Sequence, residues 1–262
     1  MSHLTCIIDQ RVAVITLDNA PQNRIGDQMV EELAGAMTQI ARSDARAVLL
    51  CAAGADFSFG GDILPWPERS RSELRRTFEH YLEVFNRFEL LPLPVVAAVQ
   101  GLCFGGGLEL ALRADVIFAS RGAGFGHPEQ TLGIVTLLGG IYRVAERAGR
   151  ARAAEWALTS EQISAAAMES AGVVNKVLAD DDLLAHSRAF AEKLAKGPTQ
   201  AFAAHKMLLR AWANGGVAAA DEIMIDVAMP VLDSKDAIGG IASAVSAMKA
   251  GKPRPAFPFE GE

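Results

Sequence analysis

The chain has 262 residues, of which 50% are hydrophobic and 21% are charged, so it can build a large buried core and lacks the composition of a disordered protein. Its formal net charge is -6 and it has no basic run, which argues against a nucleic-acid partner. The cysteines, Cys6, Cys51 and Cys103, are scattered without metal-ligand spacing, which is typical of buried thiols in a reducing compartment.

The amino-terminal region shows strand periodicity and then helix periodicity. Residues 4–8 and 11–17 are rich in β-branched side chains and are separated by Asp9 and Gln10, which predicts an antiparallel hairpin. Asp27 stands where it would cap the first turn of a helix. Apolar residues then recur at near-helical spacing, at Met29, Leu33, Met37 and Ile40. No basic segment followed by an apolar run opens the chain, and no later apolar stretch reaches about 18 residues, so we expect a cytoplasmic protein without membrane segments.

The middle of the chain alternates between strands and helices. After a strand at 45–51, residues 52–67 are rich in Gly and Pro and predict a loop, a kind of segment that often carries function. A helix over 74–88 ends at two prolines, before a buried strand at 95–99. Short strands follow at 115–119, 122–126 and 173–178, and this alternation predicts an α/β fold.

The last third of the chain is helical in pattern. Helices are predicted near 183–195, 198–213, 218–229 and 235–249, with Gly or Pro residues at the breaks, including Pro230. We therefore divide the chain into a core over 1–196 and a helical carboxy-terminal subdomain over 197–262.

The segment FGGGLELA, residues 104–111, is the sharpest chemical signal. Three glycines close a predicted turn from strand to helix, where backbone N–H groups have no intrahelical partner and can stabilise a developing negative charge. That is the physical basis of an oxyanion hole. The alternative is that the glycines only allow close packing. The spacing matches neither GxGxxG nor a P-loop.

Two glutamates form the second signal. Glu109 is surrounded by apolar residues, so a helix there would carry its carboxylate into an apolar environment, where such groups are rare without a partner or a task. An ion pair with Arg113 one turn later explains Glu109 equally well. Glu129 follows Pro128 in a segment of few charges, and this second carboxylate favours an acid and base pair over the ion pair.

These motifs carry a resemblance over nearly the whole chain. FSFGGDI at 57–63, PVVAAVQGLCFGGGLELALRADVIFAS at 94–120 and FGHPEQTLGIV at 125–135 occur in the order and spacing of the crotonase superfamily, the enoyl-CoA hydratase/isomerase family. The resemblance implies a spiral of stacked ββα units, a helical carboxy-terminal trimerisation region, and a homotrimer or hexamer. It also implies an acyl-CoA substrate and no further cofactor. No His, Cys and carboxylate cluster has metal-ligand spacing, so we expect no metal ion, as well as no nucleic-acid or membrane partner.

The resemblance also assigns roles to individual residues. It implies that the amides of Gly61 and Gly106 form the oxyanion hole for the thioester carbonyl, and that Glu109 and Glu129 hold one water between them. It places coenzyme A along the loop near Ile63, with Lys206 approaching a phosphate and Phe257 or Phe259 over the nucleotide, although a surface lysine and a loose tail explain these last residues as well. An acyl pocket and plain core packing are equal explanations for Trp66, Phe78, Tyr81 and Leu82.

Two stretches depart from the family's pattern. Thr136 and Leu137 stand where most hydratases of the family have Pro-Gly, next to the expected water site, and Arg24 stands where the family usually has a small or apolar residue. The sequence therefore predicts hydration of a 2-enoyl-CoA to the 3-hydroxyacyl-CoA. The alternatives are isomerisation of a 3-enoyl-CoA with Glu129 as the proton shuttle, and a noncatalytic acyl-CoA-binding protein.

Overall fold

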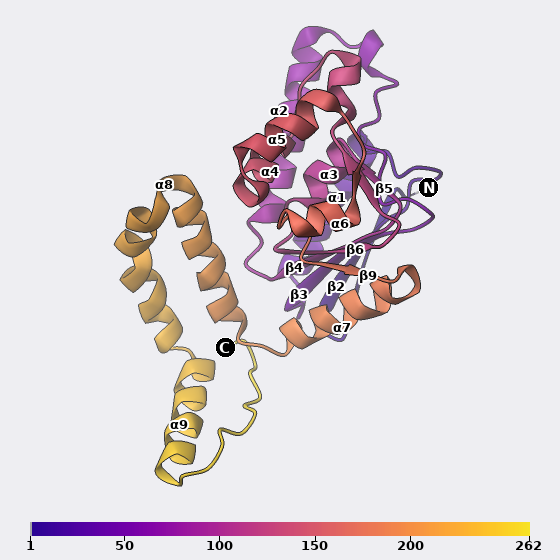
Figure 1. Cartoon of the computed structure of the whole chain (residues 1–262). Coiled ribbons are helices and arrows are strands. Elements are labelled where there is room, and N and C mark those ends of the chain that lie inside the picture. The colour runs from indigo at the N-terminus through magenta and orange to yellow at the C-terminus, as the bar shows by residue number, and fades with distance from the viewer. Residues whose placement is uncertain (1) are drawn as a thin grey trace.

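A computed structural model describes residues 2–262 of the chain and contains a large, mostly parallel sheet with a small second sheet beside it (Figure 1). The order in the large sheet is β1-β2-β3-β4-β6-β9, and the small sheet has the order β5-β7-β8. In the large sheet only the β1 and β2 pair is antiparallel. The strands are β1 Leu4–Asp9, β2 Val12–Leu17, β3 Ala47–Ala52, β4 Val95–Val99, β5 Leu102–Phe104, β6 Val116–Ser120, β7 Gly124–Gly126, β8 Ile163–Ser164 and β9 Lys176–Leu178.

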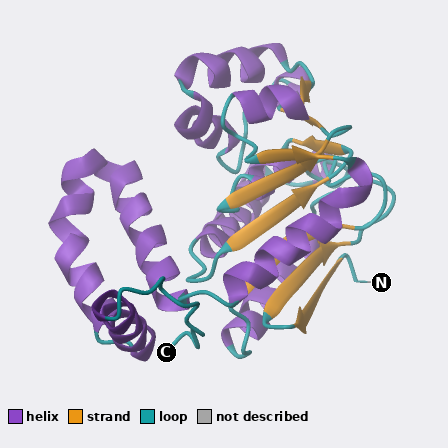
Figure 2. Cartoon of the chain, turned by 60° about the horizontal axis from the view of Figure 1, so that its bottom comes forward, coloured by secondary structure: helices purple, strands orange, loops and turns teal. Residues whose placement is uncertain are grey.

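Helices cover both faces of the large sheet, as Figure 2 shows for the strands in orange and the helices in purple. The α-helices are α1 Asp27–Ala41, α2 Arg71–Glu89, α3 Gly106–Ala111, α4 Gly140–Ala148, α5 Arg150–Thr159, α6 Ala165–Ser170, α7 Leu183–Ala195, α8 Thr199–Leu232 and α9 Lys235–Lys249. Short 3-10 helices are η1 Trp66–Glu68, η2 Pro128–Leu132 and η3 Asp180–Asp182. With the hairpin and the ββα units, this confirms the predicted α/β spiral.

The first hairpin forms where the β-branched runs predict it, with a register that pairs Leu4 with Leu17. Its turn lies one residue later than the sequence suggests. Gln10 and Arg11 have φ values of 50° and 62°, and positive φ at both central residues is the geometry of a turn whose twist matches the two strands.

The predicted helix cap at Asp27 is wrong. Gly26 precedes α1 in extended conformation, and Asp27 is the first helical residue. Its carboxylate is taken up by tertiary partners, because it accepts hydrogen bonds from the Arg69 guanidinium at 2.5 Å and from the Tyr81 hydroxyl at 2.6 Å. The apolar spacing itself is confirmed, since all four predicted core positions of this helix are buried.

Alternation along the strands divides the core into two layers. In β3, Val48 and Leu50 join the main cluster with α1 and α2, whereas Leu49 and Cys51 face α7. Because both faces are covered, the strand is a continuous apolar run, as expected for a buried parallel strand.

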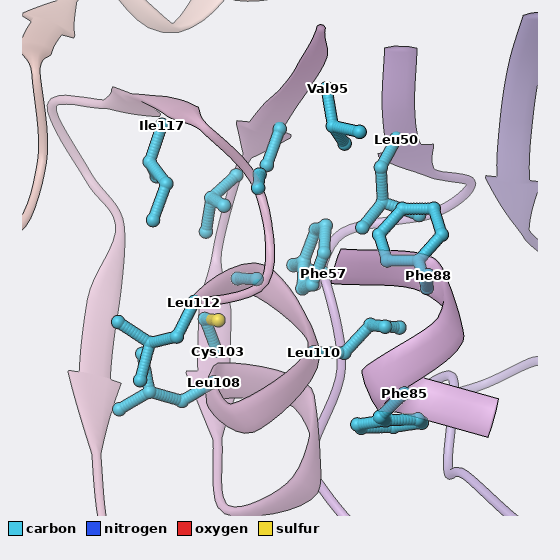
Figure 3. Packing of buried hydrophobic residues seen from close by; sticks show 14 of the residues in the cluster. Leu50, Phe57, Phe85, Phe88, Val95, Cys103, Leu108, Leu110, Leu112 and Ile117 are labelled. Carbon is cyan, nitrogen blue, oxygen red and sulfur yellow. The ribbon is translucent and has the colours of Figure 1, made fainter. Parts of the chain in front are cut away.

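The short helix α3 is anchored in the main cluster, which is the feature that positions the site. Leu108, Leu110 and Leu112 are each 1% exposed, and Figure 3 shows Leu108 and Leu112 beside Cys103 and Leu110 on the side of Phe85 of α2. Fully burying a leucine side chain contributes about 2 kcal/mol, so these residues hold a helix too short to be stable alone. Glu109 sits between these anchors.

The carboxy-terminal helices stand apart from the sheet (Figure 1). Helix α8 has non-helical backbone at Gly215 and Gly216, which fits the predicted break between two helices. The predicted break between the last two helices is present but comes slightly later than Pro230, because α8 continues to Leu232 and α9 begins at Lys235. The division of the chain at residue 197 remains a prediction.

The tail after α9 is docked rather than loose. Phe257 and Phe259 pack edge to face at 5.2 Å, and the amides of Glu260 and Gly261 donate to the carboxylate of Asp236 on α9. The buried side chain of Arg46 donates to the carbonyl of Phe259 at 2.9 Å, which ties the tail to the core. Whether the tail covers a nucleotide remains a prediction.

Candidate active site

The Gly-rich turn leads from β5 into α3 and has no room for side chains. Gly105 has a φ of 48°, and a Cβ built there would lie 3.1 Å from Glu129 Oε1. A Cβ on Gly107 would lie 2.6 Å from the Cβ of Ser58. Glycine is therefore required for two reasons, a left-handed backbone and the close approach of two neighbouring segments.

The amides predicted to form an oxyanion hole lie close together. A Cβ on Gly106 would be only 3.4 Å from the Gly61 nitrogen. The segment at Gly61 is held by Ile25, whose N–H donates to the Gly60 carbonyl and whose carbonyl accepts from Asp62. Within residues 2–262, neither the Gly61 nor the Gly106 N–H has a recorded hydrogen-bond partner. Two adjacent free donors can bind one oxygen.

Glu109 is buried and its carboxylate is fixed by backbone amides. The residue is 2% exposed, and its Oε1 accepts from the N–H of Leu138 at 2.8 Å and of Gly140 at 2.9 Å. Burial raises the pKa of Glu109, while the two amides and the charge of Arg113 oppose that rise. The i to i+4 ion pair with Arg113 is not formed, because that guanidinium instead bonds Glu89 at 2.8 Å.

Glu129 lies on η2 and has a different environment. Its Oε2 is buried without a hydrogen-bond partner among residues 2–262, and the nearest ring nitrogen of His127 is 3.9 Å away. Burial raises the pKa of Glu129 to about 7; a backbone hydrogen bond opposes the rise, and the charge of nearby Glu109 adds to it. A carboxyl group with this pKa can exchange a proton near neutrality.

The imidazole of His127 is the third polar group at this position. It is 1% exposed, and both ring nitrogens are buried without a partner within the described chain. Burial lowers the pKa of His127 to about 4, so the ring is neutral at working pH. It makes no ion pair with Glu129 in that state.

The loop that lacks Pro-Gly still delivers its amides. Thr136 accepts a weak hydrogen bond from the N–H of Ile141 at 3.3 Å, and the chain turns at Gly139 with a φ of 91°. A Cβ on Gly140 would lie 2.6 Å from the His127 ring and 3.0 Å from the Glu109 Cγ. Sequence reasoning missed that the amides of Leu138 and Gly140 bind Glu109, although the Gly-Gly pair was a signal that the backbone comes close to another group.

The aromatic residues predicted to bind the acyl group pack against one another in a row. Trp66 and Phe78 meet edge to face at 5.1 Å, and Phe78 and Tyr81 at 6.5 Å. A Cβ on Gly61 would lie 3.5 Å from the Trp66 ring, so Trp66 is the aromatic residue that adjoins the free N–H of Gly61. Ile63 is 37% exposed on the same loop. The Tyr81 hydroxyl points elsewhere, to Asp27.

Lys206 lies far from the Gly-rich turn. Its Nζ donates to the Leu93 carbonyl and the Asp115 carboxylate, both at 2.8 Å. Leu93 lies two residues before β4 and Asp115 one residue before β6, at the opposite end of the strands from the turn. Arg24 lies over the Phe59 ring at 5.1 Å. The structure therefore brings together the two glutamates, the two glycines and Trp66, but not Lys206.

Within residues 2–262, no group of three His, Cys, Asp or Glu side chains has the geometry to hold a metal ion. In the same residues, no helix is both long and apolar enough to cross a membrane.

The chain is similar in sequence to known proteins. The family model described as enoyl-CoA hydratase/isomerase matches residues 8–239. A probable enoyl-CoA hydratase of Rhodobacter capsulatus is 35% identical over 205 residues, covering 78% of this chain and 79% of that protein. The 2,3-dehydroadipyl-CoA hydratase of Escherichia coli is 33% identical over 219 residues, covering 80% and 82%.

Solved structures agree with the sequence relatives. An enoyl-CoA hydratase from Bacillus anthracis superposes with a TM-score of 0.88 at 27% identity, covering 99% of this chain and all of that one (100%). Subunit I of an enoyl-CoA hydratase from Geobacillus kaustophilus gives a TM-score of 0.89 at 27% identity, with 99% and 98% covered. The similarity thus includes the carboxy-terminal helices.

Proposed function

The chain belongs to the enoyl-CoA hydratase/isomerase family and is an enzyme with the crotonase fold, and from this premise we propose that it adds water across the 2,3 double bond of a 2-enoyl-CoA thioester. The observation that carries the proposal is the pair of buried carboxyl groups, Glu109 and Glu129, whose environments differ. Water addition needs one group that removes a proton and another that supplies one, and unequal environments separate these roles.

Charge develops on the thioester oxygen as water attacks. The N–H groups of Gly61 and Gly106 donate to that oxygen and stabilise the enolate. Removing one such donor in comparable sites costs about 3 kcal/mol of transition-state stabilisation. Coenzyme A is part of the substrate, and this chemistry needs no metal ion or further cofactor.

The two glutamates take the roles of base and acid. Glu109, held by two amides, is the ionised base that takes a proton from water as the hydroxyl group bonds to C3. Glu129, with a pKa of about 7, is the acid that gives its proton to C2. After one turnover Glu109 carries a proton and Glu129 has lost one, so a proton exchange restores the starting state.

The loop around Thr136 bears on the isomerase alternative. Isomerisation of a 3-enoyl-CoA needs Glu129 alone as the shuttle and no bound water. The two amides that hold Glu109 favour hydration, because an isomerase would have no use for a fixed second carboxylate.

The test is direct. Incubation with crotonyl-CoA should bleach the absorbance of the conjugated thioester, and a 3-enoyl-CoA should give no new conjugated product. Appearance of that product without hydration would make the protein an isomerase. Binding of acyl-CoA without either reaction would indicate a noncatalytic acyl-CoA-binding protein.

The assembly is proposed to be a homotrimer or hexamer. Helices α8 and α9 expose a series of large apolar side chains that a single chain leaves in water, among them Met207, Leu209, Trp212, Ile225, Ile238 and Met248. Light scattering that gives a stable monomer at micromolar concentration would exclude this assembly.

A further inference from the structure

Two arginines hold the carbonyl side of the loop whose amides bind Glu109. Arg113 Nη2 donates to the Leu138 carbonyl at 2.6 Å, and Arg143 Nη1 donates to the Gly139 carbonyl at 3.3 Å. The Gly139 carbonyl and the Gly140 N–H belong to one peptide group, so Arg143 and Glu109 bind its two ends. A hydrogen bond at one end of a peptide polarises the other end.

Both guanidinium groups are joined to one carboxylate. Glu89, the last residue of α2, accepts from Arg113 Nη1 at 2.8 Å and from Arg143 at 2.6 and 2.9 Å in a two-pronged arrangement. Burial would raise the pKa of Glu89, but the hydrogen bond from Arg143 and the charge of Arg113 outweigh it and lower that pKa. Glu89 is therefore ionised, and the three side chains together carry one net positive charge.

A purely structural explanation is that Arg113 links α3 to α2. It is 1% exposed, and a buried charge needs partners, which Glu89 and Asn86 supply. Stability alone leaves two facts unexplained. Arg113 Nη2 donates to the Leu138 carbonyl, whose peptide group lies between the two N–H groups that donate to Glu109. The charges of Arg113 and Arg143 also both lower the pKa of Glu109 against the effect of its burial.

We propose that Glu89, Arg113 and Arg143 are positioning residues that fix the 138–140 loop and thereby hold Glu109 in place as the base. None of the three needs to touch the substrate. The proposal rests on the proposed function in that Glu109 acts as the base. It also accounts for a loop without Pro-Gly that still presents two convergent amides.

The test compares three arginine variants, Arg113→Met, Arg143→Met and the control Arg147→Met. Arg147 lies one turn beyond Arg143 on α4 and donates to the carbonyls of Leu112 and Ala114, away from the loop. Crotonyl-CoA hydration should show about a tenfold or larger loss of kcat for the first two variants, with little change in KM. The acidic limb of the pH profile should move to higher pH, because losing a positive charge raises the pKa of Glu109. Arg147→Met should change neither.

One outcome of the kinetic comparison would contradict the proposal. If Arg143→Met loses no more kcat than Arg147→Met and its acidic limb does not move, the three residues are structural and the proposal is wrong. Thermal melts followed by circular dichroism identify variants that do not fold. Should Arg113→Met be one of them, Arg143→Met and Glu89→Gln carry the test, since these side chains are 13% and 34% exposed.

A second readout separates this proposal from the proposed function. The carboxyl carbon of Glu109 can be titrated by NMR in a Glu129→Gln background, with and without Arg143→Met, and needs no turnover. A higher pKa in the double variant supports positioning even if the wild type hydrates no enoyl-CoA. An unchanged pKa overturns positioning even if the wild type is an efficient hydratase.

Discussion

The two catalytic carboxyl groups that we propose sit in segments built on opposite principles. Glu109 lies on a helix packed into the core, and its carboxylate is bound by two amides. Glu129 lies on a short 3-10 segment, and its Oε2 has no partner within residues 2–262. Hydrogen bonds from two amides therefore fix the position of the Glu109 carboxylate, whereas burial without a partner at Oε2 raises the pKa of Glu129.

The largest expected effect comes from removing either group. Glu109→Gln and Glu129→Gln should each lower kcat by about a hundred- to ten-thousandfold while leaving coenzyme A affinity nearly unchanged. Because the two share one water, the double variant should be little worse than either single variant. Steady-state kinetics and a binding titration measure both. If only Glu129→Gln matters, the one-base isomerase replaces the hydratase.

A less severe change displaces Glu109 without removing it. In Gly140→Ala, the new Cβ would meet the His127 ring at 2.6 Å, so that ring must move, and it would press on the Glu109 Cγ at 3.0 Å, so the Glu109 side chain must give slightly. A misplacement of about 1 Å can cost about a hundredfold, so this smaller displacement should lower kcat by about tenfold. Gly35→Ala, in α1 with open space around it, is the control and should keep full activity. Equal kcat values for the two variants would show that the position of Glu109 is not critical.

Glu129 should make the protein less stable at high pH. Its folded pKa of about 7 exceeds the ordinary 4.5, so its contribution is present below pH 4.5 and is lost as pH rises through 7. The loss is at most about 3 kcal/mol. Glu129→Gln should therefore unfold at higher denaturant concentration than wild type at pH 8 and at the same concentration at pH 4. A variant less stable than wild type at pH 8 would contradict the raised pKa.

The alkaline limb of activity follows from the same group. If Glu129 must carry the proton that reaches C2, kcat/KM should fall as pH rises through about 7. A profile flat from pH 6 to pH 9 would remove Glu129 from the role of acid.

The smallest expected effect concerns His127. Its folded pKa of about 4 lies below the ordinary 6.5, so the ring contributes stability above pH 6.5 that is lost as pH falls through 4. His127→Gln should reduce this acid sensitivity in denaturant titrations and change kcat only a few-fold. A shift in the alkaline limb of the variant would show that His127, and not Glu129, titrates there.

Local patterns predicted most of the fold. The first hairpin, the core face of α1 and the break at Gly215 and Gly216 follow from side-chain periodicity and glycine chemistry, which act over a few residues. Asp27 was mispredicted because Arg69 and Tyr81, more than forty positions away, compete for its carboxylate.

The candidate site shows the same division. Glu109, Glu129 and the glycine turn are visible because their residue types are unusual for their surroundings. The amides of Leu138 and Gly140 and the carboxylate of Glu89 are not visible, since every residue except proline has an N–H and glutamate is a common residue type. Only the folded chain brings them together.

The lack of a partner at the buried Oε2 of Glu129 has a consequence for enzyme engineering. Because no residue in the described chain binds its buried Oε2, a substitution at this position breaks only the hydrogen bond from the residue's own backbone, whereas a change at Glu109 breaks two hydrogen bonds from other residues. The glycine amides and the core around α3 would remain as an unchanged frame. Under the mechanism that we propose, position 129 is therefore where directed evolution can exchange one proton donor for another, and redirect an enolate to a different product, without having to rebuild the fold.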